Sequence, residues 1–125
     1  MSVVGVGVDV VDVERFTRAL ERTPALKARL FGPSENTQRP LAGHSLAARF
    51  AAKEATLKAL GGHIPGFTWH DIVVTGEHLQ PPGLELRGGT HEAAKSQGVS
   101  RSHLSLSHDA GVAMAFVVLE SGSPQ

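Results

Sequence analysis

An almost unbroken run of apolar residues opens the chain. Residues 3–10 read VVGVGVDV, in which every position except Asp9 is valine or glycine. A run of β-branched residues without polar alternation is typical of a strand that is buried on both faces or packed against another subunit. The pattern therefore predicts a strand over 3–10 that carries a carboxylate near its carboxyl end.

A helical period follows this strand. Val13, Phe16 and Leu20 recur at spacings of three and four residues, which places them on one face of a helix. Asp12 directly precedes the pattern and is a favourable N-cap, because its carboxylate can accept hydrogen bonds from unpaired backbone N–H groups. We expect this helix to end at about Arg22.

Proline and glycine divide the next segment. Pro24 ends the first helix, and a shorter helix with Leu26 and Leu30 facing inward is expected before Gly32. Residues 33–44, PSENTQRPLAGH, have the composition of a turn and no apolar period. They predict an exposed loop.

The longest helix is predicted over residues 46–60, with Ser45 as its cap and a glycine pair at its end. On a helical wheel, the buried stripe is expected to consist of Leu46, Phe50, Leu57 and Leu60. A shoulder of small residues lies beside it, formed by Ala47, Ala51 and Ala55. Lys53 falls within the leucine stripe, where we expect its ammonium group to reach solvent at the end of an apolar stem.

The rest of the chain predicts short strands and one short helix. Strands are expected over 69–75 and 84–87, a helix over 91–96, and a hairpin whose strands span 102–107 and 112–119. This mixture favours the α+β class, a single domain with an antiparallel sheet and one long helix. The domain is expected to cover 1–120, with a flexible tail over 121–125.

Length and composition restrict the class of protein. A chain of 125 residues is long enough for one domain with one core. Twelve Lys and Arg balance twelve Asp and Glu, so the total charge predicts no nucleic-acid partner and no membrane partner. The sequence contains no cysteine and no apolar run long enough to span a membrane, which favours a cytoplasmic protein.

Positive charge is concentrated between residues 15 and 29. This segment, which we call the basic patch, carries the following charged residues: Arg15, Arg18, Arg22, Lys27 and Arg29 against Glu21. Solvated helix faces are often basic, so the patch has an explanation that requires no partner. The alternative is a docking surface for an acidic helix, where charge governs the encounter rate and the specificity of binding.

Three charged side chains indicate a phosphate-transfer site if the fold brings them together. Asp9 ends an apolar strand, where a lone carboxylate is costly without a cation, and Glu54 and Lys58 are one turn apart on the long helix. Two carboxylates can hold a Mg²⁺ ion whose other ligands are water and phosphate oxygens, and a lysine can neutralise phosphate charge. The competing explanation for Glu54 and Lys58 is an ordinary surface pair of small energy.

Residues 105–109, SLSHD, place hydroxyls, an imidazole and a carboxylate at the end of a predicted strand. Ser107 and His108 are suited to phosphate contacts, although a single histidine in a turn is also often structural. The other six histidines do not have the spacing of a zinc ligand set.

Three separated segments follow one another in the order and spacing of a known family. They are GVGVDVVDVERF (5–16), ARFAAKEATLKALG (48–61) and SLSHDAGVAMAFVV (105–118), and RLFGPSE (29–35) is a further match. Together they resemble the holo-acyl-carrier-protein synthase family, the small trimeric class of 4′-phosphopantetheinyl transferases. The resemblance implies that family's fold and its reaction, the Mg²⁺-dependent transfer of 4′-phosphopantetheine from coenzyme A to a serine of an apo acyl carrier protein, with release of 3′,5′-ADP.

The resemblance also implies roles for individual residues. Asp9 and Glu54 correspond to ligands of a Mg²⁺ ion that holds the coenzyme A diphosphate, and Lys58 to a phosphate contact that assists departure of 3′,5′-ADP. Either Glu54 or a metal-activated water takes the proton from the carrier serine. The residues expected near the diphosphate at the late strand are Ser107, His108 and, in a supporting role, Asp109.

The family is a homotrimer with its active sites between subunits, which implies that residues 3–8 and 112–119 are partly buried by neighbours. Its carrier protein is received at positions that fall within the basic patch, namely Arg15, Arg22, Leu26 and Arg29. The chain departs from the family at residues 80–83, which read QPPG in place of a Gly-basic-Pro turn. Residues 36–44 have no clear counterpart, so the adenine and 3′-phosphate contacts are not assigned.

Two other functions remain open. The same ligands could serve a Mg²⁺-dependent hydrolase of a nucleotide diphosphate, in which water replaces the carrier serine. The chain could also be a non-catalytic module that binds acidic helices through the basic patch. Within the transferase reading, the sequence does not say whether fatty-acid, polyketide or peptide carriers are accepted.

Overall fold

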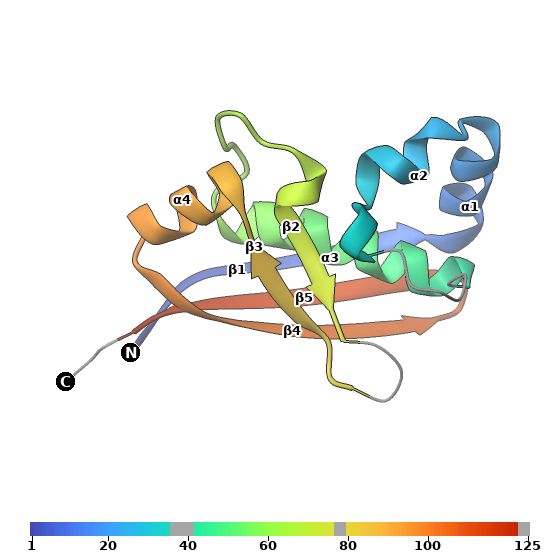
Figure 1. Ribbon diagram of the computed structural model, residues 1–125. Helices are drawn as coiled ribbons and strands as arrows, with labels where there is room; N and C mark the ends of the chain where they lie inside the picture. Colours follow the sequence, from blue (N-terminus) through green and yellow to red (C-terminus); the bar gives the residue numbers. More distant parts are fainter. Residues whose placement is uncertain (36–41, 77–79, 123–125) are drawn as a thin grey trace.

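A long helix lies across one face of a three-stranded antiparallel sheet (Figure 1). The computed structural model describes residues 1–35, 42–76 and 80–122. The helix is α3 (Gly43–Ala59), and the sheet has the strand order β1-β5-β4. Its strands are β1 (Ser2–Asp12), β4 (Val99–Asp109) and β5 (Val112–Ser121).

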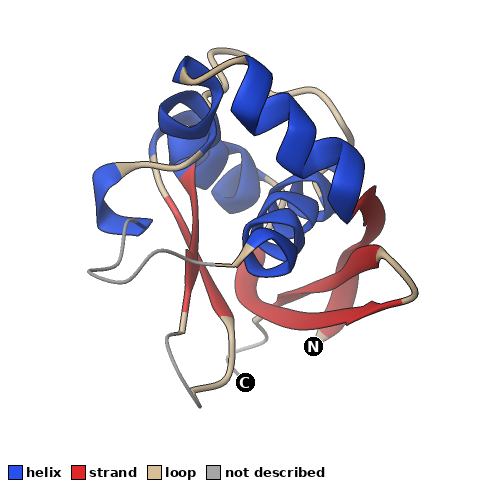
Figure 2. Ribbon diagram, turned by 90° about the vertical axis from the view of Figure 1, so that its right-hand side faces the viewer, coloured by secondary structure: helices blue, strands red, loops and turns tan. Residues whose placement is uncertain are grey.

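The remaining helices and a second pair of strands lie beside α3 and the three-stranded sheet (Figure 2). A second antiparallel sheet pairs β2 (Ile72–Thr75) with β3 (Gly83–Leu86). The other helices are α1 (Val13–Arg22), α2 (Ala25–Leu30) and α4 (Gly88–Ser96), with short 3₁₀ helices at Pro33–Glu35 and Trp69–Asp71. This architecture confirms the predicted α+β class. In the described part of the chain, no helix has both the length and the apolarity to cross a membrane.

Several local predictions are confirmed. The Asp12 carboxylate caps α1 by accepting a hydrogen bond from the backbone N–H of Arg15 at 2.8 Å. Gly61 and Gly62 follow α3 with positive φ angles, as a helix end requires. The predicted hairpin is β4 and β5, and β5 continues to Ser121, whereas residues 123–125 of the expected tail lie outside the described residues.

The segment before α3 differs from the predicted loop. Residues 33–35 form a 3₁₀ helix in which Glu35 is buried, and residues 36–41 lie outside the described residues. Helix α3 begins at Gly43 with Ala42 at the N-cap position, so the prediction of a Ser45 cap was wrong. No side-chain hydrogen bond caps the helix, and Gly43 packs close to α1, where a Cβ would lie only 2.8 Å from Oγ1 of Thr17.

Two further boundaries were wrong. Residues 69–71, predicted as the start of a strand, form a 3₁₀ helix before β2. Helix α4 begins at residue 88, three residues before the predicted start at 91. Its first turn consists of Gly88, Gly89 and Thr90, whose low helix propensity concealed it in the sequence.

Alanines form much of the buried face of α3, and the predicted leucine stripe is confirmed at Leu46 and Leu60 but wrong at Phe50 and Leu57. Phe50 and Leu57 are only half-buried, whereas the fully buried alanines are Ala47, Ala51, Ala52 and Ala55. The cause lies in β1. A Cβ on Gly7 would lie 1.8 Å from the carbonyl oxygen of Ala55, and Gly5 approaches α3 equally closely. Because the two backbones are this close, the helix face toward the sheet must carry small side chains.

Lys53 is fully buried, contrary to the expectation that its ammonium group reaches solvent. Its Nζ donates to Glu35 Oε1 at 2.7 Å and to the backbone carbonyl oxygens of Trp69 at 2.9 Å and Ile72 at 2.7 Å. Burial lowers the pKa of Lys53, while the hydrogen bond and the charge of Glu35 raise it. These three acceptors replace solvent and connect α3 to both 3₁₀ helices and to β2.

We expect Lys53→Met to destabilise the fold strongly, because it leaves the buried Glu35 carboxylate without its cation. Loss of one partner of a buried ion pair costs about 3–5 kcal/mol. Urea unfolding followed by circular dichroism measures this loss as a lower free energy of unfolding. The matched control is Lys95→Met on the exposed side of α4, which should change that free energy by less than about 0.5 kcal/mol.

The double variant Lys53→Met/Glu35→Leu tests the cause of the loss. Removing both charges leaves no buried, unpaired carboxylate, so the double variant should be more stable than Lys53→Met alone. A single variant as stable as the unmodified chain would contradict the role given to this pair.

Candidate active site

Asp9 and Lys58 form an ion pair between β1 and α3. The Lys58 Nζ donates to Asp9 Oδ1 at 3.0 Å and to the backbone carbonyl oxygen of Val8 at 3.1 Å. The strand alternation places Asp9 on the same face of β1 as Gly7, which is the face toward α3. The Asp9 side chain is 15% exposed and that of Lys58 54%, so the pair lies where the helix–strand contact opens to solvent.

Glu54 lies beside this ion pair, one turn before Lys58 on α3. Burial raises the pKa of Glu54, the negative charge of Asp9 raises it further, and Lys58 lowers it. Asp9 and Glu54 line the same groove, although they come from different elements. The structure therefore brings together the three charged residues that the sequence singled out, and a simple surface pair on α3 does not account for Asp9.

The donor set of Asp9 and Glu54 fits a hard divalent cation. Two nearby carboxylates repel each other, and a cation bound between them removes that repulsion. Mg²⁺ commonly binds proteins through one or two carboxylates and completes its shell with water and substrate phosphate. Within the described ranges, no group of three or more His, Cys, Asp or Glu residues is arranged to hold a metal ion on its own. The pair is therefore suited to a cation that arrives with a phosphate ligand.

An open groove of about 570 Å³ begins at the two carboxylates and continues along α1 and α2. Aromatic rings line it. The rings of Phe16 and Phe50 are stacked with centroids 5.2 Å apart, and Trp69 lies 5.4 Å from Phe50. The sequence did not reveal this lining, because Phe50 was expected in the core and Trp69 in a strand. Phe50 faces the groove because α3 buries its alanine face against the sheet.

The basic patch borders the same groove. Arg15, Leu26 and Arg29 belong to its lining. Arg22 is exposed at the end of α1 and lies outside the lining. A negatively charged segment bound along α1 and α2 would therefore lie next to the Asp9 and Glu54 carboxylates.

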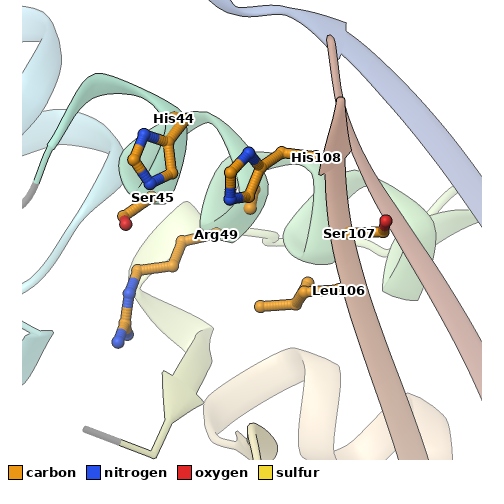
Figure 3. Close-up of a pocket in the computed structure, with 7 residues that line it drawn as sticks. His44, Ser45, Arg49, Leu106, Ser107 and His108 are labelled. Atoms are coloured by element: carbon orange, nitrogen blue, oxygen red, sulfur yellow. The ribbon is translucent and has the colours of Figure 1, made fainter. Parts of the chain in front are cut away.

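His108 lies in a second cavity, on the other side of α3 (Figure 3). This cavity has a volume of about 260 Å³, and the residues that line it include His44, Ser45, Arg49 and Leu106. Strands β4 and β1 are at opposite edges of the sheet, so His108 and Asp9 are separated by β5. A single chain does not bring His108 to the acid pair.

Ser107 belongs to the lining of the second cavity, whereas Asp109 does not. Figure 3 shows the Ser107 hydroxyl on the side of β4 opposite to the His108 ring, as expected for consecutive residues of a strand. Asp109 ends β4 opposite Val112 and is exposed. In one chain, neither side chain is near Glu54.

The sequence missed His44 and Arg49 as residues of this cavity. Arg49 donates to the backbone carbonyl oxygens of Val74 at 2.9 Å and Gly76 at 3.1 Å, which holds its guanidinium group against the end of β2. His44 had no distinguishing spacing in the sequence, because its neighbour in space is on another element. Arg49 falls in the quoted segment 48–61, where its charge was a usable signal.

The sheet face away from α3 is apolar and exposed in the single chain. Its large exposed side chains are Val3, Val6, Val8, Val10, Met114 and Phe116. Val3 is 60% exposed and Phe116 47%. Within one chain, strand β1 is therefore buried on one face only. The predicted packing of its other face against another subunit stays a prediction.

Comparisons with known proteins all find members of one family. The family model of the 4′-phosphopantetheinyl transferase superfamily matches residues 5–117. A holo-[acyl-carrier-protein] synthase of Clavibacter michiganensis is 53% identical over 120 residues, which cover 96% of this chain and 98% of the relative.

Solved structures agree with this similarity. The crystal structure of the holo-[acyl-carrier-protein] synthase of Neisseria meningitidis has a TM-score of 0.81 and 32% identity, and the match covers 95% of this chain and 99% of that one. The Helicobacter pylori holo-[acyl-carrier-protein] synthase in complex with coenzyme A has a TM-score of 0.79 and 30% identity, covering 92% and 99%.

Proposed function

The chain belongs to the 4′-phosphopantetheinyl transferase superfamily, among the holo-[acyl-carrier-protein] synthases, and we propose that its Asp9 and Glu54 hold Mg²⁺ during the transfer. The reaction moves the 4′-phosphopantetheine arm of coenzyme A to a serine of an apo acyl carrier protein and releases 3′,5′-ADP. The observation that carries this proposal is the convergence of Asp9, Glu54 and Lys58 at the end of an open groove.

The charges of the three side chains fit the demands of this reaction. Asp9 and Glu54 would hold the Mg²⁺ ion, which would supply positive charge to the diphosphate of coenzyme A. In the transfer, the serine oxygen forms a bond to the β-phosphorus, and the bond from that phosphorus to the 3′,5′-ADP oxygen breaks. Lys58 is half-exposed where it pairs with Asp9, so its ammonium group can move from Asp9 to a phosphate oxygen and stabilise the leaving group. Glu54, directly or through a water molecule, accepts the proton of the attacking serine hydroxyl.

Glu54→Gln tests the site. The substitution keeps the size of the side chain but removes its charge and basicity, so we expect kcat to fall at least about 100-fold. Mass spectrometry of an apo carrier protein incubated with enzyme, coenzyme A and Mg²⁺ measures the added arm. The matched control is Glu92→Gln on the exposed surface of α4, which should keep the full rate.

Two results would contradict parts of this proposal. A Glu54→Gln variant with the full rate would remove Glu54 from the site. Release of free phosphopantetheine in the absence of any carrier protein, at the rate of the carrier reaction, would identify a hydrolase instead of a transferase.

We further propose that the basic patch receives the acidic helix of the carrier protein. Arg15 and Arg29 line the groove that begins at the acid pair, and Arg22 extends the positive surface along α1. A carrier helix bound there would present its serine toward Glu54. Leu26 adds an apolar contact between the arginines, which suits a helix with both acidic and apolar positions.

The double variant Arg15→Glu/Arg29→Glu tests this docking surface. Reversing two charges replaces attraction with repulsion, so the KM for the carrier protein should rise by more than about tenfold. The KM for coenzyme A should stay unchanged, because these arginines belong to the carrier side of the groove. Lys95→Glu on α4 is the control, and an unchanged KM for the carrier in the double variant would exclude the docking surface.

The separation of His108 from the acid pair supports a homotrimer with shared active sites. One subunit supplies Asp9, Glu54 and Lys58, and the second cavity of a neighbour supplies His108 for phosphate contacts. The exposed apolar sheet face, with Val8 and Phe116, offers the surface that such an assembly needs to bury.

Mixing two inactive variants tests the shared site. Glu54→Gln and His108→Ala subunits, unfolded together and refolded as an equal mixture, form some sites in which both residues are intact. With random assortment in a closed ring, about a quarter of the sites regain full activity. The transfer assay and light scattering measure the recovered rate and the oligomeric state.

Each variant refolded alone is the control and should stay inactive or slow. A site built within one chain gives no recovery on mixing, because every chain then carries one defect. That result, or a monomer by light scattering, would rule out the shared site while leaving the transfer reaction intact.

A further inference from the structure

The rings of His44 and His108 pack against each other in a tilted arrangement at the second cavity. Their centroids are 4.2 Å apart, and the ring planes are inclined by 31°. His44 belongs to the first turn of α3, and His108 lies near the end of β4. Figure 3 shows both rings on the side of β4 that faces the cavity, above the side chain of Arg49. Two distant parts of the sequence thus meet in one pair of imidazoles.

The polar side chains of the cavity differ in how they are held in place. Arg49 is fixed by the carbonyl oxygens of Val74 and Gly76. His44 and His108 are both exposed, and among residues 1–35, 42–76 and 80–122 no hydrogen bond to a protein group holds either ring. In the described part of the chain, contact with the His44 ring is therefore what orients the His108 side chain. An exposed side chain without such a contact would sample several rotamers, and ordering it on binding would reduce affinity.

The chemistry of the cavity suits a phosphate group. Two imidazoles, a guanidinium group and the Ser45 hydroxyl all offer hydrogen-bond donors within a volume of about 260 Å³. Leu106 closes the cavity on the sheet side. A phosphate contact by His108 requires the ring to face this space, and His44 is the side chain that packs against it.

We propose that His44 is a positioning residue for coenzyme A, because its ring holds the His108 imidazole toward the phosphate-binding cavity. This inference rests on the proposed function, in which His108 contacts a phosphate of coenzyme A. His44 acts on coenzyme A through His108. Its loss weakens coenzyme A binding and leaves the acid pair, and therefore the chemical step, unchanged.

His44→Ala and His44→Phe test this role in the complete enzyme. An aromatic pair contributes an amount that corresponds to a factor of about two to ten in binding. We expect His44→Ala to raise the KM for coenzyme A by about threefold to tenfold with kcat unchanged. His44→Phe keeps a stacking ring without imidazole nitrogens and should restore most of the affinity. His63→Ala, an exposed histidine after α3, is the control and should behave as the unmodified enzyme.

The double variant His44→Ala/His108→Ala separates positioning from a general structural effect. If His44 acts through His108, the double variant binds coenzyme A with the same Kd as His108→Ala alone, in calorimetric titrations that do not depend on turnover. Additive losses, a fall in kcat, or a KM for coenzyme A that does not change in His44→Ala would each overturn the inference. Thermal unfolding of each variant identifies a folding defect, and in that case His44→Phe carries the test.

Parallel assays with dephospho-coenzyme A identify the phosphate concerned. A His44→Ala effect that disappears with this substrate assigns the cavity to the 3′-phosphate, and an effect that persists assigns it to the diphosphate. Failure of the proposed function can also be distinguished from failure of this inference. An unmodified enzyme that transfers no arm refutes the proposed function, whereas an active enzyme that is indifferent to His44 refutes only this inference.

Discussion

The direct contact between the backbones of β1 and α3 is the constraint on which the rest of the structure depends. Gly5 and Gly7 allow it from the strand, because a Cβ at either position would overlap a carbonyl oxygen of α3. The alanines of α3 allow it from the helix. This contact places Asp9 beside Lys58 at 3.0 Å and within electrostatic reach of Glu54. A larger side chain in the contact would separate the carboxylates. The packing of the core therefore also determines the geometry of the site.

Lys53 and Glu54 are consecutive residues of α3 that lie in different environments. Lys53 points into the interior, where Glu35 and two backbone carbonyl oxygens surround its ammonium group. Glu54 points to the groove, where it is half-buried beside Asp9. The buried pair connects α3 to the elements behind it and so limits rotation of the helix about its own axis. A rotation large enough to expose Lys53 would also move Glu54 and Phe50 away from the groove.

Helix α3 divides the polar residues of the molecule into two groups. The carboxylates, Arg15 and Arg29 lie on one side, along an aromatic groove, and Lys58 binds Asp9 next to it. The imidazoles and Arg49 lie on the other side, in a smaller cavity. One chain therefore presents the two carboxylates, for which we propose cation binding, and the imidazole cavity, for which we propose phosphate binding, on opposite sides of α3. In the closed ring of identical chains that we propose, the two sides would meet at every boundary, and the apolar face of the sheet would supply surface for the ring to bury.

The sequence by itself determined the features that a few neighbouring residues encode. These are the strand over β1, the Asp12 cap, the glycine end of α3, the β4–β5 hairpin, and the spacing of Glu54 and Lys58. Its distributed motifs also identified the family. Tertiary structure alone decided which face of α3 is buried, because the close approach of Gly5 and Gly7 favours alanine over leucine there. It also decided the environment of Lys53, the stacking of His44 on His108, and the separation of His108 from Asp9. Periodicity describes one element at a time, whereas these contacts join elements that are distant in the chain, and only their packing determines which side chains meet.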